Sequence, residues 1–328
     1  MLFALSGCGA HRGGTQSAGP PSGPAVEAGS SLEAAASAPA TAQYTFTMDP
    51  FEVPSGAESY ECQDILNPLG KDVAIVKSES TISMGAHHMF AFDIPLSTSA
   101  LAPDASAPDG ASLASPDAST SSIFDCPAGG LEFHPYLHLT QRAHDVMTYP
   151  EGVGRMLGQA EVIRLNVHYL NVSSSPVQVS AEVTLTYVDP SAVNQLASWI
   201  FVFSQSLQVP VGTSTQTFAY PVTADMNLIQ ANGHMHRRGT HFEAHAIAAD
   251  AGEMRPLYSS DTWDEPPSLH LEPPFEIKKG DSLGYSCTYS NDTGAALTYG
   301  ESAATNEMCN FFGVFYPSAD GTGLLMGL

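Results

Sequence analysis

Histidine is the residue type in this sequence with the clearest capacity for metal chemistry, because a neutral imidazole is a common ligand of transition metals. Two groups are closely spaced: His87 and His88 are adjacent, and His234 and His236 are separated only by Met235. With 12 histidines among 328 residues, chance produces ~0.4 adjacent pairs and as many His-x-His pairs, so neither motif alone establishes a metal site. The alternative for each is a histidine on a half-exposed strand.

The strands expected around these histidines add information, because side chains alternate between the two faces of a β-strand. In the segment 228–236, one face carries the polar residues Gln230, Asn232, His234 and His236. In the segment 162–172, His168 lies opposite the apolar face formed by Ile163, Leu165, Val167 and Tyr169. A histidine of the core would lie on the apolar face. We therefore expect these imidazoles to project from the polar side, where His234 and His236 can chelate one metal ion.

A third segment, 307–312, offers a sulfur ligand. Met308, Asn310 and Phe312 share one face of the expected strand, and Cys309 lies on the other. Met308 therefore faces a site or packs in the core, and for an isolated methionine core packing is the simpler explanation.

These residues lie in a chain of short β-type segments separated by Gly, Pro, Asn and Asp, among them 73–76, 82–94, 162–172, 177–188, 199–203 and 309–316. No long segment with helical periodicity occurs. The pattern predicts an all-β fold of two consecutive antiparallel, jelly-roll-like β-sandwiches. A composition shift at 189–191 places the sandwiches at 44–188 and 189–328, and the chain length suits two domains.

Two stretches are too poor in apolar residues to form a core. Residues 1–43 are rich in Gly, Ala, Ser and Pro and predict a disordered tether, and 96–122 predict a disordered surface insertion.

Charge restricts the partners. The chain carries 11 Lys and Arg against 34 Asp and Glu, a net charge of −23, so it should repel nucleic acids and anionic membranes. No apolar run is long enough for a transmembrane helix. We expect a monomer whose partners are metal ions and a small-molecule substrate.

Five cysteines are present. Cys62, Cys126, Cys287 and Cys309 suit two disulfides in an oxidising compartment. Three pairings are open; the simplest local one joins Cys62 to Cys126 and Cys287 to Cys309, and four buried thiols are the alternative. Cys8 follows Leu5-Ser6-Gly7 and resembles the lipid-bearing cysteine of a bacterial lipoprotein. This predicts export, to the periplasm and outer membrane or outside the cell, with membrane attachment only through Cys8.

Four stretches together resemble the copper type II, ascorbate-dependent monooxygenase family. They are 87–89 (His-His-Met), 167–169 (Val-His-Tyr), 234–236 (His-Met-His) and 307–310 (Glu-Met-Cys-Asn), in the family's order. The resemblance implies that one copper ion, the electron-transfer copper, binds His87, His88 and His168. It implies that His234, His236 and Met308 bind the catalytic copper that activates O2. Ascorbate or a similar reductant would be the co-substrate. The two half-sites would face a solvent-filled cleft, and the pairings Cys62–Cys126 and Cys287–Cys309 would be family disulfides.

Departures from the family concern the substrate. Asn232 stands where peptide-hydroxylating members carry an arginine that holds the substrate carboxylate, and an asparagine cannot form that charged bidentate pair. Phe312 replaces a tyrosine and Asn166 a glutamine, whereas Asn310 matches. Asn232, Asn310 and Phe312 are thus candidate substrate-binding residues for an amine or another small, mostly neutral molecule.

Three functions compete. The first is a copper monooxygenase that hydroxylates a C–H bond of a small substrate. The second is a non-catalytic copper-binding or copper-delivery lipoprotein, and the third a carbohydrate- or protein-binding β-sandwich with incidental histidines. His241, Glu243 and His245 share a strand face and suggest a weaker metal site; the other histidines and the tryptophans are interpreted as structural.

Overall fold

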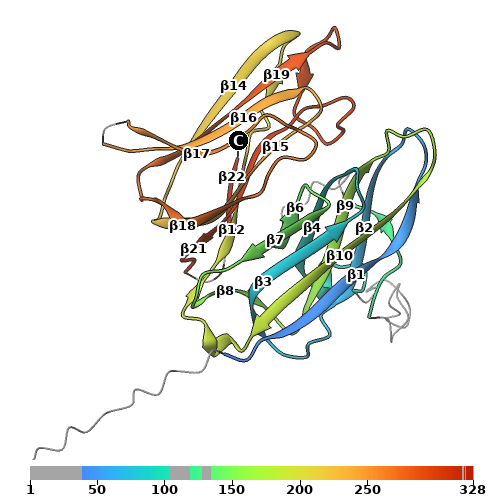
Figure 1. Ribbon diagram of the computed structural model, residues 1–328, viewed down its shortest axis with the longest axis vertical. Helices are drawn as coiled ribbons and strands as arrows, with labels where there is room; N and C mark the ends of the chain where they lie inside the picture. Colours follow the sequence, from blue (N-terminus) through green and yellow to red (C-terminus); the bar gives the residue numbers. More distant parts are fainter. Residues whose placement is uncertain are drawn as a thin grey trace, which may run out of the picture. The chain divides into compact units, whose positions relative to one another are not determined.

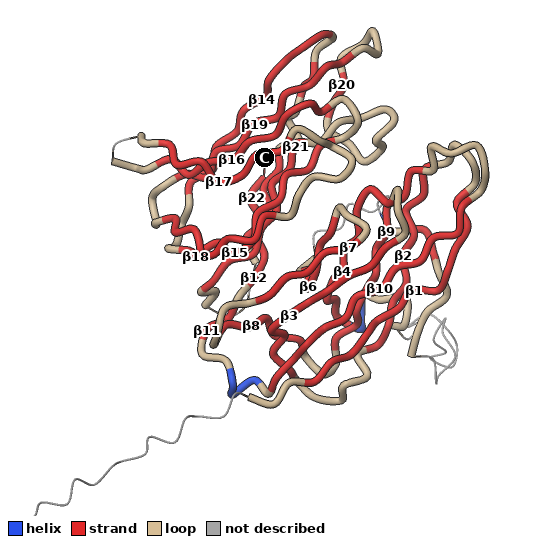
Figure 2. Tube along the Cα trace, in the orientation of Figure 1, coloured by secondary structure: helices blue, strands red, loops and turns tan. Residues whose placement is uncertain are grey.

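The described part of the chain is built almost entirely of β-strands. The computed structural model describes residues 39–102, 119–127, 134–250, 252–319, 321 and 323–327, and its strands are joined by turns and loops (Figure 2). The all-β prediction is confirmed. Residues Pro39–Leu328 form one compact unit. Within the described residues, no helix has the length and hydropathy needed to cross a membrane.

The first group of strands, here called the N-terminal half (residues 39–196), forms two sheets (Figure 1). One has the order β1-β10-β3-β8-β11, with β7 also paired to β3, and the other has the order β5-β2-β9-β4-β6. The bounds are β1 Ala42–Val53, β2 Glu58–Leu66, β3 Val73–Ile82, β4 Ala86–Pro95, η1 Leu96–Thr98, β5 Phe124–Asp125, β6 Tyr136–Thr140, β7 His144–Thr148, β8 Val153–Leu157, β9 Glu161–Leu170, β10 Val177–Val188, η3 Pro190–Ala192 and β11 Gln195–Leu196.

The second group, the C-terminal half (residues 198–327), forms sheets of order β18-β15-β21-β12-β22 and β14-β19-β16-β17, and a short ladder β13-β20. The bounds are β12 Ser198–Phe203, β13 Gln208–Val209, β14 Gly212–Pro221, β15 Met226–Met235, β16 Gly239–Ile247, β17 Met254–Ser260, β18 Leu269–Ile277, β19 Ser282–Asn291, β20 Leu297–Thr298, β21 Cys309–Tyr316 and β22 Leu324–Gly327. Strand β10 ends at Val188, and the first group of strands continues beyond it, because β11 pairs with β8.

Burial along the strands explains which ones carry the site. In β10, buried Val179, Ala181, Val183 and Leu185 alternate with exposed or half-buried positions, as expected for a sheet with one face in solvent. In β9, which lies between β2 and β4, every residue from Val162 to Tyr169 is buried. Polar side chains on β9 are therefore enclosed, and each needs a partner.

Two hydrophobic cores fill the unit. The larger lies between the sheets of the N-terminal half but also takes in Trp199, Phe201, Phe203 and Phe312 of the C-terminal half. The Phe312 ring lies 5.6 Å from that of Phe90 and is stacked on Phe201 at 4.5 Å. The second core belongs to the C-terminal half alone. The two halves thus meet through packed aromatic side chains.

Both predicted disulfides are present. Cys62 is bonded to Cys126 beside β5, and Cys287 of β19 is bonded to Cys309 of β21. Such bonds are typical of an oxidising compartment, which agrees with the predicted export.

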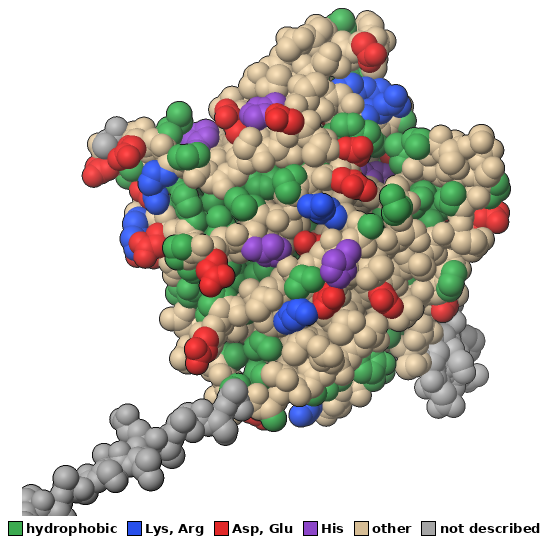
Figure 3. All heavy atoms as spheres, viewed as in Figure 1, with side chains coloured by type: hydrophobic (Ala, Val, Ile, Leu, Met, Phe, Trp, Pro, Cys, Tyr) green, Lys and Arg blue, Asp and Glu red, His purple; other side chains and the backbone are tan. Residues whose placement is uncertain are grey.

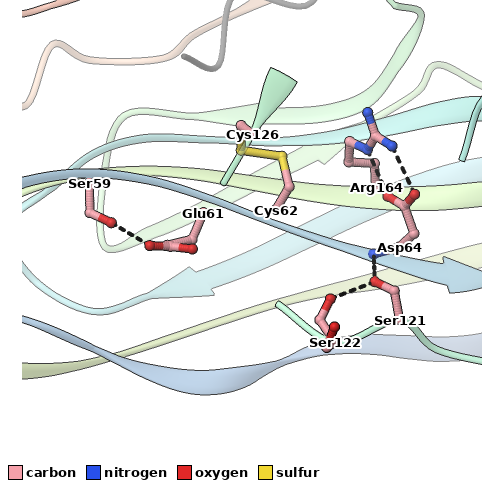
Figure 4. The surroundings of a disulfide bond; sticks show 8 residues. All are labelled: Ser59, Glu61, Cys62, Asp64, Ser121, Ser122, Cys126 and Arg164. Atoms are coloured by element: carbon pink, nitrogen blue, oxygen red, sulfur yellow. Dashed lines mark hydrogen bonds and ion pairs between the residues drawn. A yellow bond between two sulfur atoms is a disulfide. The ribbon is translucent and has the colours of Figure 1, made fainter. Parts of the chain in front are cut away.

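The structure describes both ends of the segment 96–122, which was expected to be disordered throughout. Next to the Cys62–Cys126 bond, Asp64 forms a buried ion pair with Arg164 at 2.7 Å, and its backbone N–H donates to the Ser121 hydroxyl (Figure 4). Its carboxylate also accepts from the Ala100 N–H at 2.6 Å. These bonds order both ends of the segment. Residues 103–118, most of the tether and Cys8 lie outside the described residues.

Candidate metal centre

The histidines of the N-terminal half lie around β9. His168 pairs with His88 on β4 and with Tyr60 on β2, and directly paired residues of neighbouring strands project to the same face. The Tyr60 ring is stacked on the His168 imidazole with centroids 4.1 Å apart. The rings of His88 and His168 lie 4.9 Å apart.

A β-bulge brings His87 to the same place. Neighbours on a regular strand face opposite sides, so His87 would point away from His88. In β4, however, the register shifts between Ala86 and His88, which leaves His87 as the extra, unpaired residue. Its ring lies 5.4 Å from His88 and 5.1 Å from His168. The structure therefore brings together the three histidines of the first predicted set.

The second set lies on two adjacent strands of the C-terminal half. His234 on β15 pairs with Asn310 on β21, and Asn232 pairs with Phe312, so these four side chains share one face. His236 follows the end of β15, and its ring is 5.4 Å from His234. Met308 is buried just before β21; its sulfur accepts a hydrogen bond from Asn310 Nδ2 at 3.3 Å and thus lies on the face of His234.

The two sets are in contact, which corrects the expectation of a solvent-filled cleft between them. The His87 ring lies 4.7 Å from His234 and 5.5 Å from His236, and His88 is 5.3 Å from His234. Nitrogen atoms of His87, His234 and His236 all lie within 4.8 Å of one another. The imidazoles form one cluster, here called the histidine cluster (His87, His88, His168, His234 and His236), because the aromatic contact closes the two halves on each other.

Burial keeps the cluster neutral. Loss of solvation, followed by the proximity of the other imidazoles, holds the pKa of His87, His88 and His234 well below the usual value. Burial lowers the pKa of His236 to about 3. Burial also lowers the pKa of His168, although Glu58 acts in the opposite direction. Neutral imidazoles each keep one lone pair, which is the form that binds a metal.

Glu58 on β2 determines which nitrogen of His168 faces the cluster. Its carboxylate accepts from His168 Nε2 at 2.9 Å, so the Nδ1 atom is left facing His88 Nε2 at 3.3 Å. The same carboxylate accepts from the Ser302 hydroxyl and the Ala303 N–H of the C-terminal half, at 2.8 Å each. Burial would raise the pKa of Glu58, yet these bonds lower it to about 2.

The histidines of the second set also have their Nδ1 atoms bonded. Nδ1 of His234 lies 2.5 Å from Gln141 Oε1, and Nδ1 of His236 lies 3.3 Å from the Asn306 carbonyl. Glu307 holds the turn that follows, because its carboxylate accepts from the backbone N–H groups of His236 and Arg238. Burial, opposed by these bonds and by Arg238, raises the pKa of Glu307 to about 7.

The remaining nitrogen atoms fit a metal. Among the described residues, buried ring nitrogens without a hydrogen-bond partner are Nδ1 and Nε2 of His87, Nδ1 of His88, and Nε2 of His234 and His236. A buried polar atom without a partner is costly. A bound transition metal would satisfy these lone pairs, and the donor set of imidazoles with one nearby thioether suits copper.

The candidate substrate-binding residues line the same face. Asn232, Asn310 and Phe312 are all buried, and the Phe312 ring is 6.2 Å from His234. Asn232 Nδ2 has no hydrogen-bond partner among the described residues. The nearby position Asn166, two residues before His168, is also buried.

The weaker candidates lie apart from this centre. His241 is hydrogen-bonded to exposed Asp261 at 2.6 Å, and no metal-type grouping of His241, Glu243 and His245 occurs within the described residues. His138 is buried, and its two ring nitrogens are hydrogen-bonded to the hydroxyls of Ser78 and Ser80. These contacts agree with the structural role expected for it from the sequence. A pocket of about 540 Å³ lies between the end of β7 and β18, and none of the predicted site residues lines it.

Sequence reasoning missed three side chains that hold the cluster: Glu58, Gln141 and Glu307. Glu58 and Tyr60 share a strand face with Cys62, which is a faint signal, and Glu307 adjoins Met308. Nothing in the sequence distinguishes Gln141, because its partners lie 92 and 93 positions away.

On the surface view, acidic side chains are scattered over the face drawn, and the described Lys and Arg side chains there form no continuous patch (Figure 3).

Comparison with known proteins identifies relatives. Residues 209–322 match the C-terminal domain of the copper type II ascorbate-dependent monooxygenases, a range that contains His234, His236 and Met308. Peptidyl-glycine alpha-amidating monooxygenase A from Xenopus laevis is 22% identical over 297 residues, which are 86% of this chain and 29% of that protein. The resemblance predicted from the four stretches is therefore confirmed, and the chain spans less than a third of that relative's length.

Similarity to solved structures is weak. The major capsid protein P2 of bacteriophage PM2 aligns with a TM-score of 0.32 at 8% identity, covering 86% of this chain and all of that one. A structure of infectious bursal disease virus, Gx strain, aligns with a TM-score of 0.22 at 9% identity, covering 85% of this chain and 73% of that one. Scores this low carry no functional argument.

Proposed function

Since residues 209–322 match the C-terminal domain of the copper type II ascorbate-dependent monooxygenases, we propose that this protein is a copper-dependent monooxygenase that hydroxylates a C–H bond of a small substrate. The observation that supports it most is the convergence of imidazoles from both halves with buried, unpartnered nitrogens. Two coppers bound there would supply one electron each, drawn from ascorbate or a similar reductant, so that one atom of O2 enters the substrate and the other leaves as water.

The ligands of the first copper are His87, His88 and His168, held by β4 and β9. Glu58 keeps the Nε2 atom of His168 protonated, so Nδ1 is the nitrogen available to the metal. The ligands of the second copper are His234 and His236, through Nε2, and the Met308 thioether, a soft ligand that favours Cu(I). Burial excludes water from His87, His168, His234, His236 and Met308, whereas His88 is half-buried.

The substrate is proposed to be an amine or another small, mostly neutral molecule. Asn232 and Asn310 offer uncharged amide groups beside His234, and Phe312 offers an apolar wall. A carboxylate would find no guanidinium on this face, whereas a neutral polar group could accept a hydrogen bond from Asn232 Nδ2. We propose that the protein acts as a monomer, exported and anchored by a lipid at Cys8.

A second function, copper binding or delivery without catalysis, is supported by the closure of the site. His87, His168, His234 and His236 are each at most 4% exposed. A chain that stores copper needs no substrate access, and the same ligands would serve.

Copper and oxygen measurements separate the two functions. The proposed monooxygenase binds two coppers per chain and, with ascorbate, consumes O2 when an amine or amide substrate is added. Metal analysis gives the stoichiometry, and an oxygen electrode with mass spectrometry of the product gives the coupling. Copper binding without substrate-coupled O2 uptake across the screen would favour delivery, and absence of copper at any loading would exclude both.

A further inference from the structure

Gln141 joins the two halves at the histidine cluster. It lies in the turn between β6 and β7 of the N-terminal half, where the Arg142 N–H donates to the Thr140 hydroxyl at 3.0 Å. Its side chain is buried and reaches two groups of the C-terminal half. Gln141 Nε2 donates to the Gly233 carbonyl at 2.9 Å, and Gln141 Oε1 lies 2.5 Å from His234 Nδ1.

The Gly233 carbonyl fixes the orientation of the Gln141 amide. A carbonyl oxygen only accepts hydrogen bonds, so the NH2 group must face Gly233 and the amide oxygen must face His234. The amide oxygen is also only an acceptor. His234 Nδ1 must therefore carry the proton, which leaves the lone pair on Nε2, the buried nitrogen without a partner. A reversed amide would set two oxygen atoms against each other.

The β15 backbone is open to this contact because its pairing with β18 ends at Ala231, two residues before Gly233. The partner that Gly233 receives there comes from the other half of the molecule. The orientation of a ligand histidine in the C-terminal half thus depends on a side chain of the N-terminal half.

We propose that Gln141 is a positioning residue for the second copper: it holds His234 in the tautomer and ring orientation that direct Nε2 to the metal, and it does so only while the halves are in contact. This rests on the proposed function for the identity of the metal. Hydrogen-bond partners of metal-ligating histidines typically change metal affinity by about 10–100-fold when they are removed.

Three variants test the role by copper titration with graded chelators and by electron paramagnetic resonance of the Cu(II)-loaded protein. Gln141→Leu keeps the volume and removes both hydrogen bonds. We expect the affinity for one of the two coppers to fall about 10–100-fold, with the other unchanged. At low copper concentration, the spectrum of Gln141→Leu should approach that of the His236→Ala variant, which loses a ligand of the second set. Gln141→Glu has nearly the same shape, and burial favours its protonated form, in which one oxygen accepts from His234 Nδ1 and the other donates to the Gly233 carbonyl; it should retain most of the affinity.

Tyr136→Phe is the matched control. The Tyr136 hydroxyl donates to the Gly313 carbonyl at 2.7 Å across the interface between the two halves, here called the seam. Among the described residues, its ring is in contact with the rings of Phe90 and Trp199 and not with a ligand histidine. If Gln141→Leu binds both coppers as the wild type does, the proposal is wrong. It is also wrong if Tyr136→Phe or Gln141→Glu weakens copper as much as Gln141→Leu, because a loosened seam would then explain the loss. A wild-type chain that binds no copper would refute the proposed function, a result distinct from either of these.

Discussion

His87 shows how much one residue can depend on its backbone. Regular alternation would turn it away from His88, and only the unpaired position at the β4 bulge turns it into the cluster. There it lies within 5.5 Å of the rings of His88, His168, His234 and His236. At the scale of single residues, the site is a group of neutral imidazoles, and among the described residues all of them except His168 have a buried ring nitrogen without a hydrogen-bond partner.

Met308 gives the first prediction. Met308→Ala removes the only thioether proposed as a ligand, so hydroxylation should be lost while copper at His87, His88 and His168 remains. Product analysis and copper stoichiometry measure the two effects. Met235→Ala is the control. Met235 lies between His234 and His236 in the sequence, but its side chain is buried in the core of the C-terminal half. Full turnover by Met308→Ala would refute the ligand assignment.

His138 gives a prediction about pH. Burial, opposed by Asp145, lowers the pKa of His138 from 6.5 to about 4. Between these values the unfolded chain binds a proton that the folded chain does not, so stability falls as pH decreases, by about 1.4 kcal/mol per unit from this group. Above pH 6.5 the contribution is constant, and below about 4 the loss is complete.

The measurement is chemical denaturation of the metal-free protein between pH 7 and 4, with His138→Gln as the variant. The wild type should lose more stability over this range than His138→Gln does. His144→Gln, an exposed position on the neighbouring strand β7, controls for the loss of a histidine. Parallel pH profiles for wild type and His138→Gln would contradict the assignment.

Among the elements, β4, β9 and β15 carry four of the six proposed ligands, namely His87, His88, His168 and His234, and the disulfides hold strands next to the site. Cys287 and Cys309 connect the four-stranded sheet to the sheet that contains β21, immediately after Met308. The bond should therefore hold both the sandwich layers and the start of the ligand strand.

Replacing both cysteines by alanine tests this. The bond closes a loop of 22 residues, and its loss should lower the free energy of unfolding by about 3 kcal/mol in the chain-entropy model. Denaturant titration measures the change. Because β21 loses its tether next to Met308, copper of the second set should also bind less tightly. The Cys62→Ala/Cys126→Ala variant, whose bond lies in the other half, should leave that second copper unaffected.

For the compact unit as a whole, the seam between the halves matters most. Aromatic packing closes it, and polar side chains of the N-terminal half cross it at the cluster, among them Glu58 to Ser302 and Ala303, and Gln141 to Gly233 and His234. Both couple the orientation of a histidine to contact between the halves.

Glu58→Ala should disturb both sides of the seam together. His168 loses the acceptor of its Nε2 proton, and residues 301–306 lose the carboxylate that binds Ser302 and Ala303. We expect about 10-fold weaker binding of the first copper and faster hydrogen exchange at 301–306, measured by titration and by mass spectrometry. Glu61→Ala, on the same strand but bonded to Ser59, should change neither. Unchanged exchange in Glu58→Ala would contradict the coupling.

Residue types and spacing alone predicted much of this protein. The all-β fold, the strands 177–188 and 309–316 and the four stretches that resemble the copper monooxygenases all followed from local patterns. Each of these is written in neighbouring residues, because alternation and turn chemistry act over a few positions. The shared face of Met308 and Asn310 was correct for the same reason.

Folding decided what depends on distant partners. The bulge that turns His87 inward needs the register of β4 against β9, and the meeting of the two ligand sets needs the aromatic seam between the halves. Glu58 and Gln141 acquire their roles only because tertiary packing supplies the other ends of their hydrogen bonds. A buried polar group is satisfied by whatever lies beside it in space, and spacing along the chain does not encode that neighbour.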